Sequence, residues 1–332
     1  MSSAVNTSTI KSMDWPLIER EQAAKAGKYG RYFEDRDFSI ESARLILTDQ
    51  LTKLVSNPDG VVVTAQVANQ IVGVAVLRKS LWDTEHFGFG MAVLEHVIPF
   101  AEDEAKRKEI TKHLLSAVNS WLEENDIHFI SSRIPSLDLA VIQGAEEMGF
   151  RFIESWVYSK FKLKDFVKPD HIPNLRYAKE EDKELMLKYS KGAFSTQRFH
   201  ADTRFSKQKA DDLYEKWVSS AFEDKNQKIA VLDVDGAPSA FMIYYEQTKL
   251  GVEANKYTMW KFTVINPDMR GKGVGKIFFD ALKAHHAQEG SEFIESGVSL
   301  RNLPSMNLHN GLNFKLISSL TTLHKWKDET NF

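Results

Sequence analysis

The sequence predicts an α+β fold made of two copies of one domain, each a mixed, mostly antiparallel sheet flanked by helices. Three observations support this prediction. The chain contains an internal repeat, it contains strand-like runs joined by a hairpin signal, and a glycine-rich turn follows one of these runs and opens a helix. A repeat with so long a period is typical of tandem domains rather than of a solenoid.

The internal repeat is clearest in two places. Residues 31–39 (Arg-Tyr-Phe-Glu-Asp-Arg-Asp-Phe-Ser) align with residues 198–206 (Arg-Phe-His-Ala-Asp-Thr-Arg-Phe-Ser), at an offset of 198 − 31 = 167. Near the end of each copy, Phe150 aligns with Phe314 at an offset of 314 − 150 = 164. The two copies are therefore expected to share one fold.

Length and composition agree with two domains. The chain has 332 residues, more than one ordinary domain holds, and its 42% hydrophobic content with 21 Phe supplies an ample core. The Lys-rich segment 160–173 contains two prolines and is the expected junction. We therefore predict a first domain at residues 1–165 and a second at residues 174–332.

Within each copy we expect N-terminal helices, an antiparallel meander, a loop followed by a helix, and further strands around a last helix. Asp235-Gly236 between two apolar runs is a hairpin signal. In the second copy the expected strands are 228–234, 240–245, 260–265, 293–300 and 315–326, and the expected helix after the glycine turn is 277–286.

The glycine turn reads Arg270-Gly271-Lys272-Gly273-Val274-Gly275-Lys276. Glycines at alternate positions let the backbone approach a ligand closely and let successive N–H groups point the same way. At a helix N-terminus, these N–H groups and the helix dipole form a cradle for a pyrophosphate. The turn therefore predicts a cofactor that bears phosphate.

Three phosphate loops compete for this turn. A Walker loop needs four residues between its glycines, but Gly271 and Gly275 enclose three, and Ile277 stands where the hydroxyl should be. The dinucleotide fingerprint needs Gly-x-Gly-x-x-Gly, which also differs. The pattern Arg/Gln-x-x-Gly-x-Gly/Ala fits at every position, with Arg270 first. The turn thus resembles the coenzyme A pyrophosphate loop of the GNAT acyltransferase superfamily.

The segment after the next expected strand extends this resemblance. GNAT enzymes carry Asn-x-x-Ala-x-x-Leu-Tyr-x-x-x-Gly-Phe there, and Asn302, Leu308 and Phe314 match. His309 stands where the family has its tyrosine, and Asn313 where it has glycine. That tyrosine usually hydrogen-bonds the thioester sulfur and can protonate the leaving thiolate, so His309 is the candidate catalytic acid.

The resemblance implies acyl-CoA as the co-substrate. In the GNAT fold the strands before and after the loop splay apart at a bulge, and pantetheine hydrogen-bonds to the exposed backbone. The cofactor-binding residues that it implies are Phe262, Thr263, Val264, Arg270, Gly271, Lys272, Gly273, Val274, Gly275, Lys276 and Asn302.

The first copy lacks this chemistry. At an offset of 164, the three glycines of the turn correspond to Arg107, Glu109 and Thr111. Asn302 corresponds to Asp138, and His309 to Ala145. The first domain is therefore expected to have lost cofactor binding and to serve as a scaffold or as half of a substrate site.

A narrower resemblance concerns the acceptor. Residues 81–88 (Leu-Trp-Asp-Thr-Glu-His-Phe-Gly) and residues 197–205 are similar to segments of bacterial nucleotide-sugar N-acyltransferases of the dTDP-fucosamine acetyltransferase type. This implies an acceptor that is a dTDP-linked amino sugar. The acceptor-binding residues that it implies are Trp82, Asp83, Phe87, Arg198, His200 and Arg204.

A structural role is an equal alternative for part of this set. Arg198 and Asp202 recur as Arg31 and Asp35 in the copy without the glycine turn, so they fit a pair that fixes a helix over each domain. His200 and Arg204 have no such counterpart, because Phe33 and Asp37 stand at the aligned positions. Trp82 and Phe87 can also be core aromatics.

The expected reaction is direct transfer of the acyl group from the thioester to a neutral amine, with backbone N–H groups near Val264 polarising the oxyanion. Glu246, Glu253, Glu295 or a water relay are the candidate bases. The alternatives are another amine acceptor, a tRNA-dependent aminoacyl transferase with a basic face, and a non-enzymatic acyl-CoA sensor.

Other functional classes find no support in the composition. The net charge of −3 gives no global case for nucleic acid or membrane binding, and the chain has no cysteine. No His/Asp/Glu cluster has metal-ligand spacing, and His285 and His286 are expected to be solvated. We expect a cytoplasmic monomer or homodimer without a metal, since no secretory signal or apolar run of about 18 residues occurs.

Overall fold

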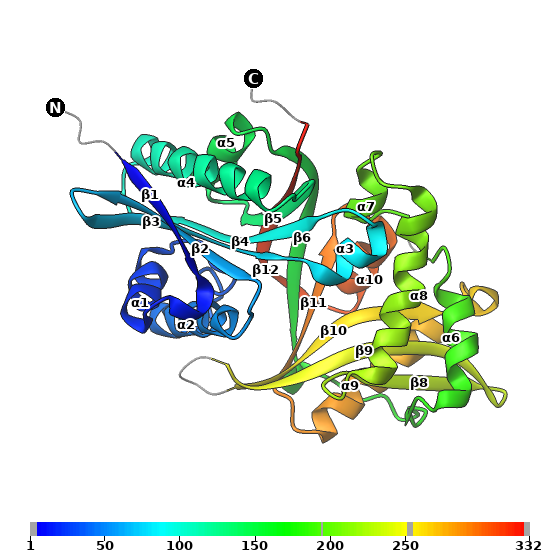
Figure 1. Cartoon of the computed structure of the whole chain (residues 1–332). Helices are drawn as coiled ribbons and strands as arrows, with labels where there is room; N and C mark the ends of the chain where they lie inside the picture. Colours follow the sequence, from blue (N-terminus) through cyan, green and yellow to red (C-terminus); the bar gives the residue numbers. More distant parts are fainter. Residues whose placement is uncertain (1–4, 194, 251–254, 329–332) are drawn as a thin grey trace. The chain divides into compact units, whose positions relative to one another are not determined.

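The computed structural model describes residues 5–193, 195–250 and 255–328, which form two compact units (Figure 1). Unit 1 holds the residues up to Trp156 and those from Ser318 on, and unit 2 holds Val157–Ile317. The predicted domains, 1–165 and 174–332, follow the sequence repeat, whereas the compact units divide the chain elsewhere. The last strand of each sequence copy ends in the unit formed by the other copy.

Unit 1 contains a sheet with helices on both faces. Its strand order is β1-β2-β3-β4-β5-β12; β4 and β5 are parallel, and the other recorded pairs are antiparallel. The elements are β1 (Asn6–Lys11), η1 (Ser12–Asp14), α1 (Leu17–Ala26), α2 (Ile40–Val55), β2 (Gly60–Val67), β3 (Gln70–Lys79), α3 (Leu81–Phe87), β4 (Met91–Pro99), α4 (Glu104–Glu124), β5 (Phe129–Pro135), α5 (Leu139–Glu147), the first part of β6 (Arg151–Lys162) and most of β12 (Lys315–Trp326).

Unit 2 repeats this plan with the strand order β6-β11-β10-β9-β8-β7. Only β10 and β11 form a recorded parallel pair among its described strands. The elements are the last part of β6, η2 (Leu163–Asp165), β7 (Arg176–Tyr177), η3 (Glu180–Asp182), α6 (Lys183–Ser190), α7 (Arg198–Ala201), α8 (Lys207–Glu223), β8 (Lys228–Val234), β9 (Ala237–Leu250), β10 (Asn255–Ile265), η4 (Pro267–Met269), α9 (Val274–Gln288), β11 (Phe293–Ser299) and α10 (Leu303–Gly311).

Each sheet separates two hydrophobic cores. In unit 1, α4 and α5 cover one face and α1 and α2 cover the other (Figure 1). In unit 2, α9 covers one face and α6 and α8 cover the other. The predicted α+β class with a mixed, mostly antiparallel sheet is therefore confirmed.

Local sequence explains where several elements begin and end. Asp235 and Gly236 have φ of 54° and 79°, which is the conformation that a two-residue hairpin turn requires between β8 and β9. β8 and β12 have the predicted bounds, whereas α9 begins at Val274, three residues before the predicted start. The helix therefore begins within the glycine-rich segment, earlier than the hydrophobic pattern alone indicates.

The sequence repeat appears as one local structure in both units. The carboxylate of Asp35 accepts a hydrogen bond from the N–H of Asp37 at 3.1 Å, and the carboxylate of Asp202 accepts one from the N–H of Arg204 at 3.2 Å. A serine then caps the helix that follows, α2 in unit 1 and α8 in unit 2. Asp202 therefore has a structural role at a helix entry.

Candidate active site

The glycine turn joins the end of β10 to the start of α9. Gly271 and Gly273 have φ of 73° and 81°, in the left-handed region that side chains disfavour. A Cβ atom added at either glycine would meet no atom within 4 Å. The conformation therefore requires glycine, and the space in front of the turn is open to a ligand.

The first turn of α9 presents main-chain donors to that space. N–H groups in the first turn of a helix have no acceptor within the helix, and the helix dipole adds partial positive charge. The first hydrogen bond of the helical pattern in α9 runs from the N–H of Ile277 to the carbonyl of Gly273 at 3.3 Å, so the N–H groups before Ile277 are left for a ligand. Lys272 is exposed, and Lys276 contacts Asp280 at 2.7 Å. The arrangement suits a diphosphate.

The strands on either side of the turn diverge. The parallel ladder between β10 and β11 runs from Tyr257–Phe293 to Trp260–Ser296, although both strands continue beyond it. A β-bulge at Lys261 interrupts the pairing of β10 with β9 at the same level. After Trp260, β10 continues to pair with β9, but its opposite edge has left the ladder with β11. An extended ligand chain could add as a strand at that edge.

The corresponding place in unit 1 is filled by protein. Arg107, which aligns with Gly271, is buried, and its guanidinium contacts the carboxylate of Asp138 at 2.7 Å. A further contact joins Arg107 to the carbonyl of Pro99 at 3.3 Å. Burial raises the pKa of Asp138, and the arginine opposes this shift. An internal ion pair occupies unit 1 where unit 2 has an open turn.

Asn302 and Asp138 share one structural role. Each caps a short helix, since the side chain of Asn302 accepts from the N–H of Ser305 at 3.1 Å and that of Asp138 from the N–H of Val141 at 3.4 Å. Asn302 as a cofactor contact stays a prediction.

His309 is buried in α10. Its Nδ1 lies 2.7 Å from the carbonyl oxygen of Ser305, and because a carbonyl only accepts, Nδ1 carries the proton. Nε2 therefore holds a lone pair, and it has no hydrogen-bond partner among the described residues. Burial lowers the pKa of His309, with the Ser305 bond opposing. At neutral pH this imidazole is a proton acceptor before it can be a donor.

The two histidines of α9 differ from expectation. His286 is fully buried and accepts a hydrogen bond at Nε2 from the indole N–H of Trp260 at 3.0 Å, while His285 contacts the hydroxyl of Tyr244 at 3.0 Å. The prediction that both are solvated is wrong for His286, because the amphipathic face of α9 turns it into the core. No group of three or more ligand-type side chains in the described ranges is arranged for a metal ion.

Unit 2 should lose stability as the pH falls below about 6.5. Burial lowers the pKa of His286 and of His309, so the unfolded chain takes up protons that the folded chain does not. The contribution of these histidines to the free energy of unfolding is complete above about pH 6.5 and disappears as the pH falls towards their lowered pKa values. Urea unfolding at about pH 7.5 and about pH 5.5 measures this change in the free energy of unfolding. His286→Gln should flatten the difference; an unchanged pH dependence would contradict this.

Trp82, Asp83 and Phe87 lie in α3 of unit 1. The hydroxyl of Ser80 donates to the carboxylate of Asp83 at 2.6 Å, and Phe87 is buried. Trp82 is 38% exposed, and its ring stacks on that of His86 at a centroid distance of 5.9 Å. Trp82 is thus a partly exposed ring, and the acceptor-binding role of all three residues stays a prediction.

Arg198, His200 and Arg204 lie in and after α7 of unit 2. The Nε2 of His200 contacts the carboxylate of Asp211 at 2.8 Å, which ties α7 to α8. The guanidinium of Arg198 lies 4.5 Å from the ring centroid of Phe199. In unit 1 the aligned Arg31 lies 5.8 Å from the ring of Tyr32, so this arrangement recurs without a cofactor turn.

The candidate bases differ in position. Ile294 packs in the core beneath α9, and because side chains alternate along a strand, Glu295 lies on the opposite face, towards α8. Glu246 contacts the ammonium groups of Lys228 at 3.1 Å and Lys256 at 3.8 Å. Glu253 lies outside the described residues. Lys261, at the bulge, was not singled out from the sequence, because a bulge leaves no periodic signal.

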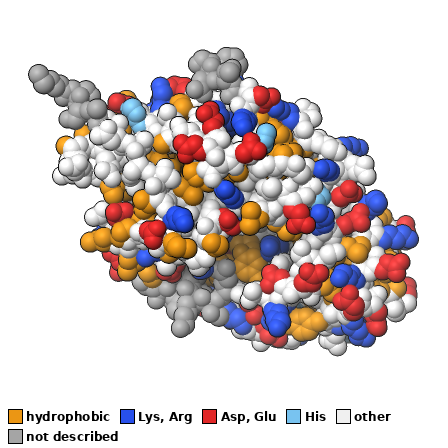
Figure 2. All heavy atoms as spheres, in the orientation of Figure 1, with side chains coloured by type: hydrophobic (Ala, Val, Ile, Leu, Met, Phe, Trp, Pro, Cys, Tyr) orange, Lys and Arg blue, Asp and Glu red, His pale blue; other side chains and the backbone are white. Residues whose placement is uncertain are grey.

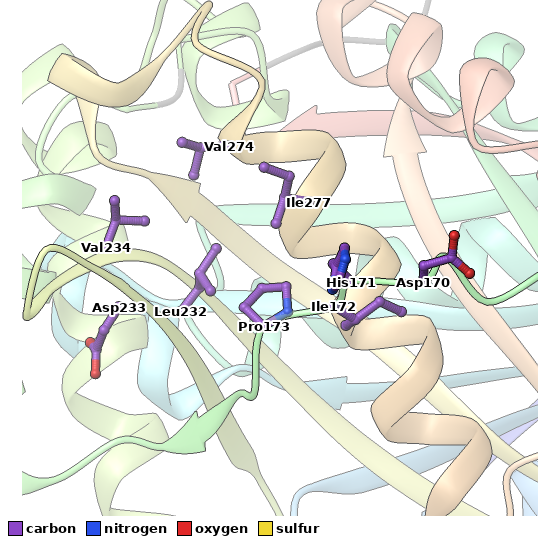
Figure 3. A pocket seen from close by; sticks show the side chains of 9 residues that line it. All are labelled: Asp170, His171, Ile172, Pro173, Leu232, Asp233, Val234, Val274 and Ile277. Atoms are coloured by element: carbon purple, nitrogen blue, oxygen red, sulfur yellow. The ribbon is translucent and has the colours of Figure 1, made fainter.

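Two pockets flank α9. One, of about 570 Å³, is lined by Val274 and Ile277 of α9, by the end of β8, and by residues 170–173 (Figure 3). Its charged lining includes the carboxylates of Asp170 and Asp233. The other, of about 540 Å³, lies between α9, α10 and residues 165–169, and its charged lining residues are Lys276, Lys283, Asp165 and Asp280. Acidic and basic side chains are therefore balanced in the second pocket.

Residues 192–314 match the acetyltransferase (GNAT) family. No curated protein matches the chain. Similar solved structures include a GCN5-related N-acetyltransferase from Sphaerobacter thermophilus, 12% identical with a TM-score of 0.63 over 99% of this chain and 97% of that one. Another is a tandem GNAT protein from the clavulanic acid biosynthesis pathway, 13% identical with a TM-score of 0.59 over 98% and 100%. These similarities extend the GNAT fold to both units.

Proposed function

Starting from a GNAT acetyltransferase domain in unit 2 of a tandem GNAT fold, we propose that the protein transfers an acyl group from acyl-CoA to the amine of a dTDP-linked amino deoxysugar. The observation that carries acyl-CoA use is the open glycine turn between diverging strands. It is present in unit 2, whereas Arg107 and Asp138 fill the aligned place in unit 1.

Two parts of the cofactor have separate places in unit 2. Main-chain N–H groups at 271–276 receive the diphosphate. Pantetheine pairs with β10 at Phe262, Thr263 and Val264, beyond the end of the ladder with β11.

Glu295, which is fully buried, is the candidate carboxylate nearest the point where the strands diverge, and we assign it the proton of the attacking amine. It lies on the α8 face beside Met259, its register partner, one step before the strands diverge. Glu246 lies on the α9 face and is paired with two lysines. Attack by the amine forms the C–N bond, Glu295 takes the proton, and the C–S bond breaks as the thiolate leaves.

His309 has a buried lone pair at Nε2, so it can pass a proton to the departing sulfur only after Nε2 has first taken one up. His309→Ala should lower turnover about tenfold and leave acetyl-CoA affinity unchanged. The effect is below the usual 10²- to 10⁴-fold of general acid–base catalysis because a thiol, with a pKa of about 8.5, leaves readily as thiolate. Steady-state kinetics and calorimetry check this. Unchanged turnover would leave His309 a purely structural role.

The acceptor part of the proposal rests on the resemblance of residues 81–88 and 197–205 to segments of nucleotide-sugar N-acyltransferases. Trp82 is 38% exposed, so a base or sugar could stack on its ring, and His200 lacks a counterpart in the first copy. A tRNA substrate is disfavoured, because acidic and basic side chains are interspersed on the face shown in Figure 2. Another small amine or a peptide N-terminus is the main alternative acceptor.

The test is thiol release from acetyl-CoA and longer acyl-CoAs, measured across a panel of dTDP- and UDP-linked amino sugars, free amino sugars, polyamines and peptides. Release that depends on a dTDP-amino sugar supports the proposal. Release with another amine alone keeps acyl transfer and rejects the nucleotide sugar. Tight CoA binding with no amine-dependent release indicates an acyl-CoA sensor.

A further inference from the structure

Lys261 lies at the point where β10 and β11 diverge. It is the extra residue of the bulge, between the pairs Trp260–Tyr244 and Phe262–Ile243. At a bulge, two successive side chains project to the same side, which here is the face of Phe262 and α8. The ammonium of Lys261 lies 5.8 Å from the ring centroid of Tyr245 on that face. This lysine and Glu295 therefore share one side of the sheet.

The surroundings of Lys261 leave its charge uncompensated. No carboxylate in the described ranges lies within ion-pair distance of its ammonium. Asp224, which favours its charged form, accepts hydrogen bonds from the side chain of Gln227 at 2.8 Å and the N–H of Asn226 at 2.9 Å. The side chain is exposed, yet enough protein surrounds the ammonium to lower its pKa.

The same position in unit 1 carries the opposite charge. The bulge of β4 falls at Glu95, between the pairs Val76–His96 and Leu77–Leu94. The carboxylate of Glu95 accepts a hydrogen bond from Arg78 at 2.7 Å, so its charge is compensated within the protein. The unit with the open glycine turn thus has an uncompensated cation at its bulge, and the unit without the turn has a paired anion.

We propose that Lys261 binds an anionic group of the acceptor, a phosphate or carboxylate several bonds from the amine. This inference rests on the proposed acyl transfer but not on the identity of the nucleotide. Strand spacing and rise put the Cα atoms of Lys261 and Glu295 roughly 8 Å apart, because Glu295 faces Met259, two residues earlier. The acceptor amine lies at Glu295 and its anion at Lys261, and a charge-assisted hydrogen bond holds the anion.

Matched acceptors test this inference. The pairs are glucosamine 6-phosphate with glucosamine, and a dTDP-linked amino sugar with the same sugar free. The wild-type protein should prefer the anionic member of each pair. Lys261→Met should raise KM for the anionic acceptor at least about tenfold, and leave the neutral acceptor and acetyl-CoA unaffected. Lys261→Arg should keep KM within about threefold, because the charge remains.

Lys228→Met is the matched control, because Lys228 contacts Glu246 on the α9 face of the same sheet. It should leave the preference intact. The inference is overturned, with acyl transfer intact, if the wild-type protein shows no preference, or if Lys261→Met affects both members of a pair equally. If acetyl-CoA binds but no amine releases thiol, both the inference and the proposed function fail.

Discussion

Replacing Gly273 with valine should lower affinity for acetyl-CoA about 100-fold, the largest effect expected at the glycine turn. A β-branched residue at a φ of 81° costs roughly 1–2 kcal/mol, and its methyl groups project into the space that the diphosphate requires. The misplaced N–H groups would also lose charge-assisted hydrogen bonds. Isothermal titration calorimetry with CoA measures the change in affinity.

Gly236→Val provides a matched control. Gly236 has a φ of 79°, and an added Cβ there also meets no atom within 4 Å, but it lies in the β8–β9 hairpin. This variant should show a similar loss of stability and unchanged CoA affinity. Equal losses of affinity in the two variants would mean that backbone strain, rather than the cradle, governs binding.

Shortening Leu323 to alanine should destabilise unit 1 by about 2–5 kcal/mol, although the residue lies near the C-terminal end of the chain. Leu323 is fully buried in the core beneath α4 and α5, opposite Ser132 of β5. Its removal leaves a cavity in a core formed mainly by the first sequence copy. Hydrogen–deuterium exchange should rise in β2 to β5.

Leu316→Ala is the control within the same strand. Leu316 is 64% exposed and belongs to unit 2, so its replacement should change stability by less than about 0.5 kcal/mol. If Leu323→Ala increased hydrogen–deuterium exchange in unit 2 and left unit 1 unaffected, the assignment of most of β12 to unit 1 would be contradicted. The expected result would make the first sequence copy dependent on the last strand of the second.

Much of the fold and of the cofactor turn could be predicted from the sequence. Alternating apolar residues and the Asp235-Gly236 turn predicted the bounds of β8, and glycines at 271 and 273 predicted a backbone that only glycine adopts readily. The repeat predicted two copies, and both units contain the same aspartate turn followed by a serine-capped helix. These features depend on residues close together in the chain.

The acceptor side was less predictable. A bulge in β10 determines the face on which Lys261 lies. The hydrogen bond from Nδ1 of His309 to the Ser305 carbonyl leaves Nε2 as the proton-accepting atom. The resemblance predicts an acceptor role for Asp83 and Phe87; in the structure Asp83 accepts a hydrogen bond from Ser80 and Phe87 is buried, and the predicted role stays a prediction. Sequence similarity cannot separate a residue kept for packing from one kept for binding.

The sequence by itself determined the local chemistry of this protein: the glycine turn, the helix caps, the alternating strands and the duplication. The tertiary structure alone decided that β12 completes unit 1, that Arg107 fills the aligned place in unit 1, and that Lys261 and Glu295 share a face. The reason is physical. Backbone conformation follows from neighbouring residues, whereas strand partners, burial and side-chain pairing depend on contacts between residues far apart in the chain.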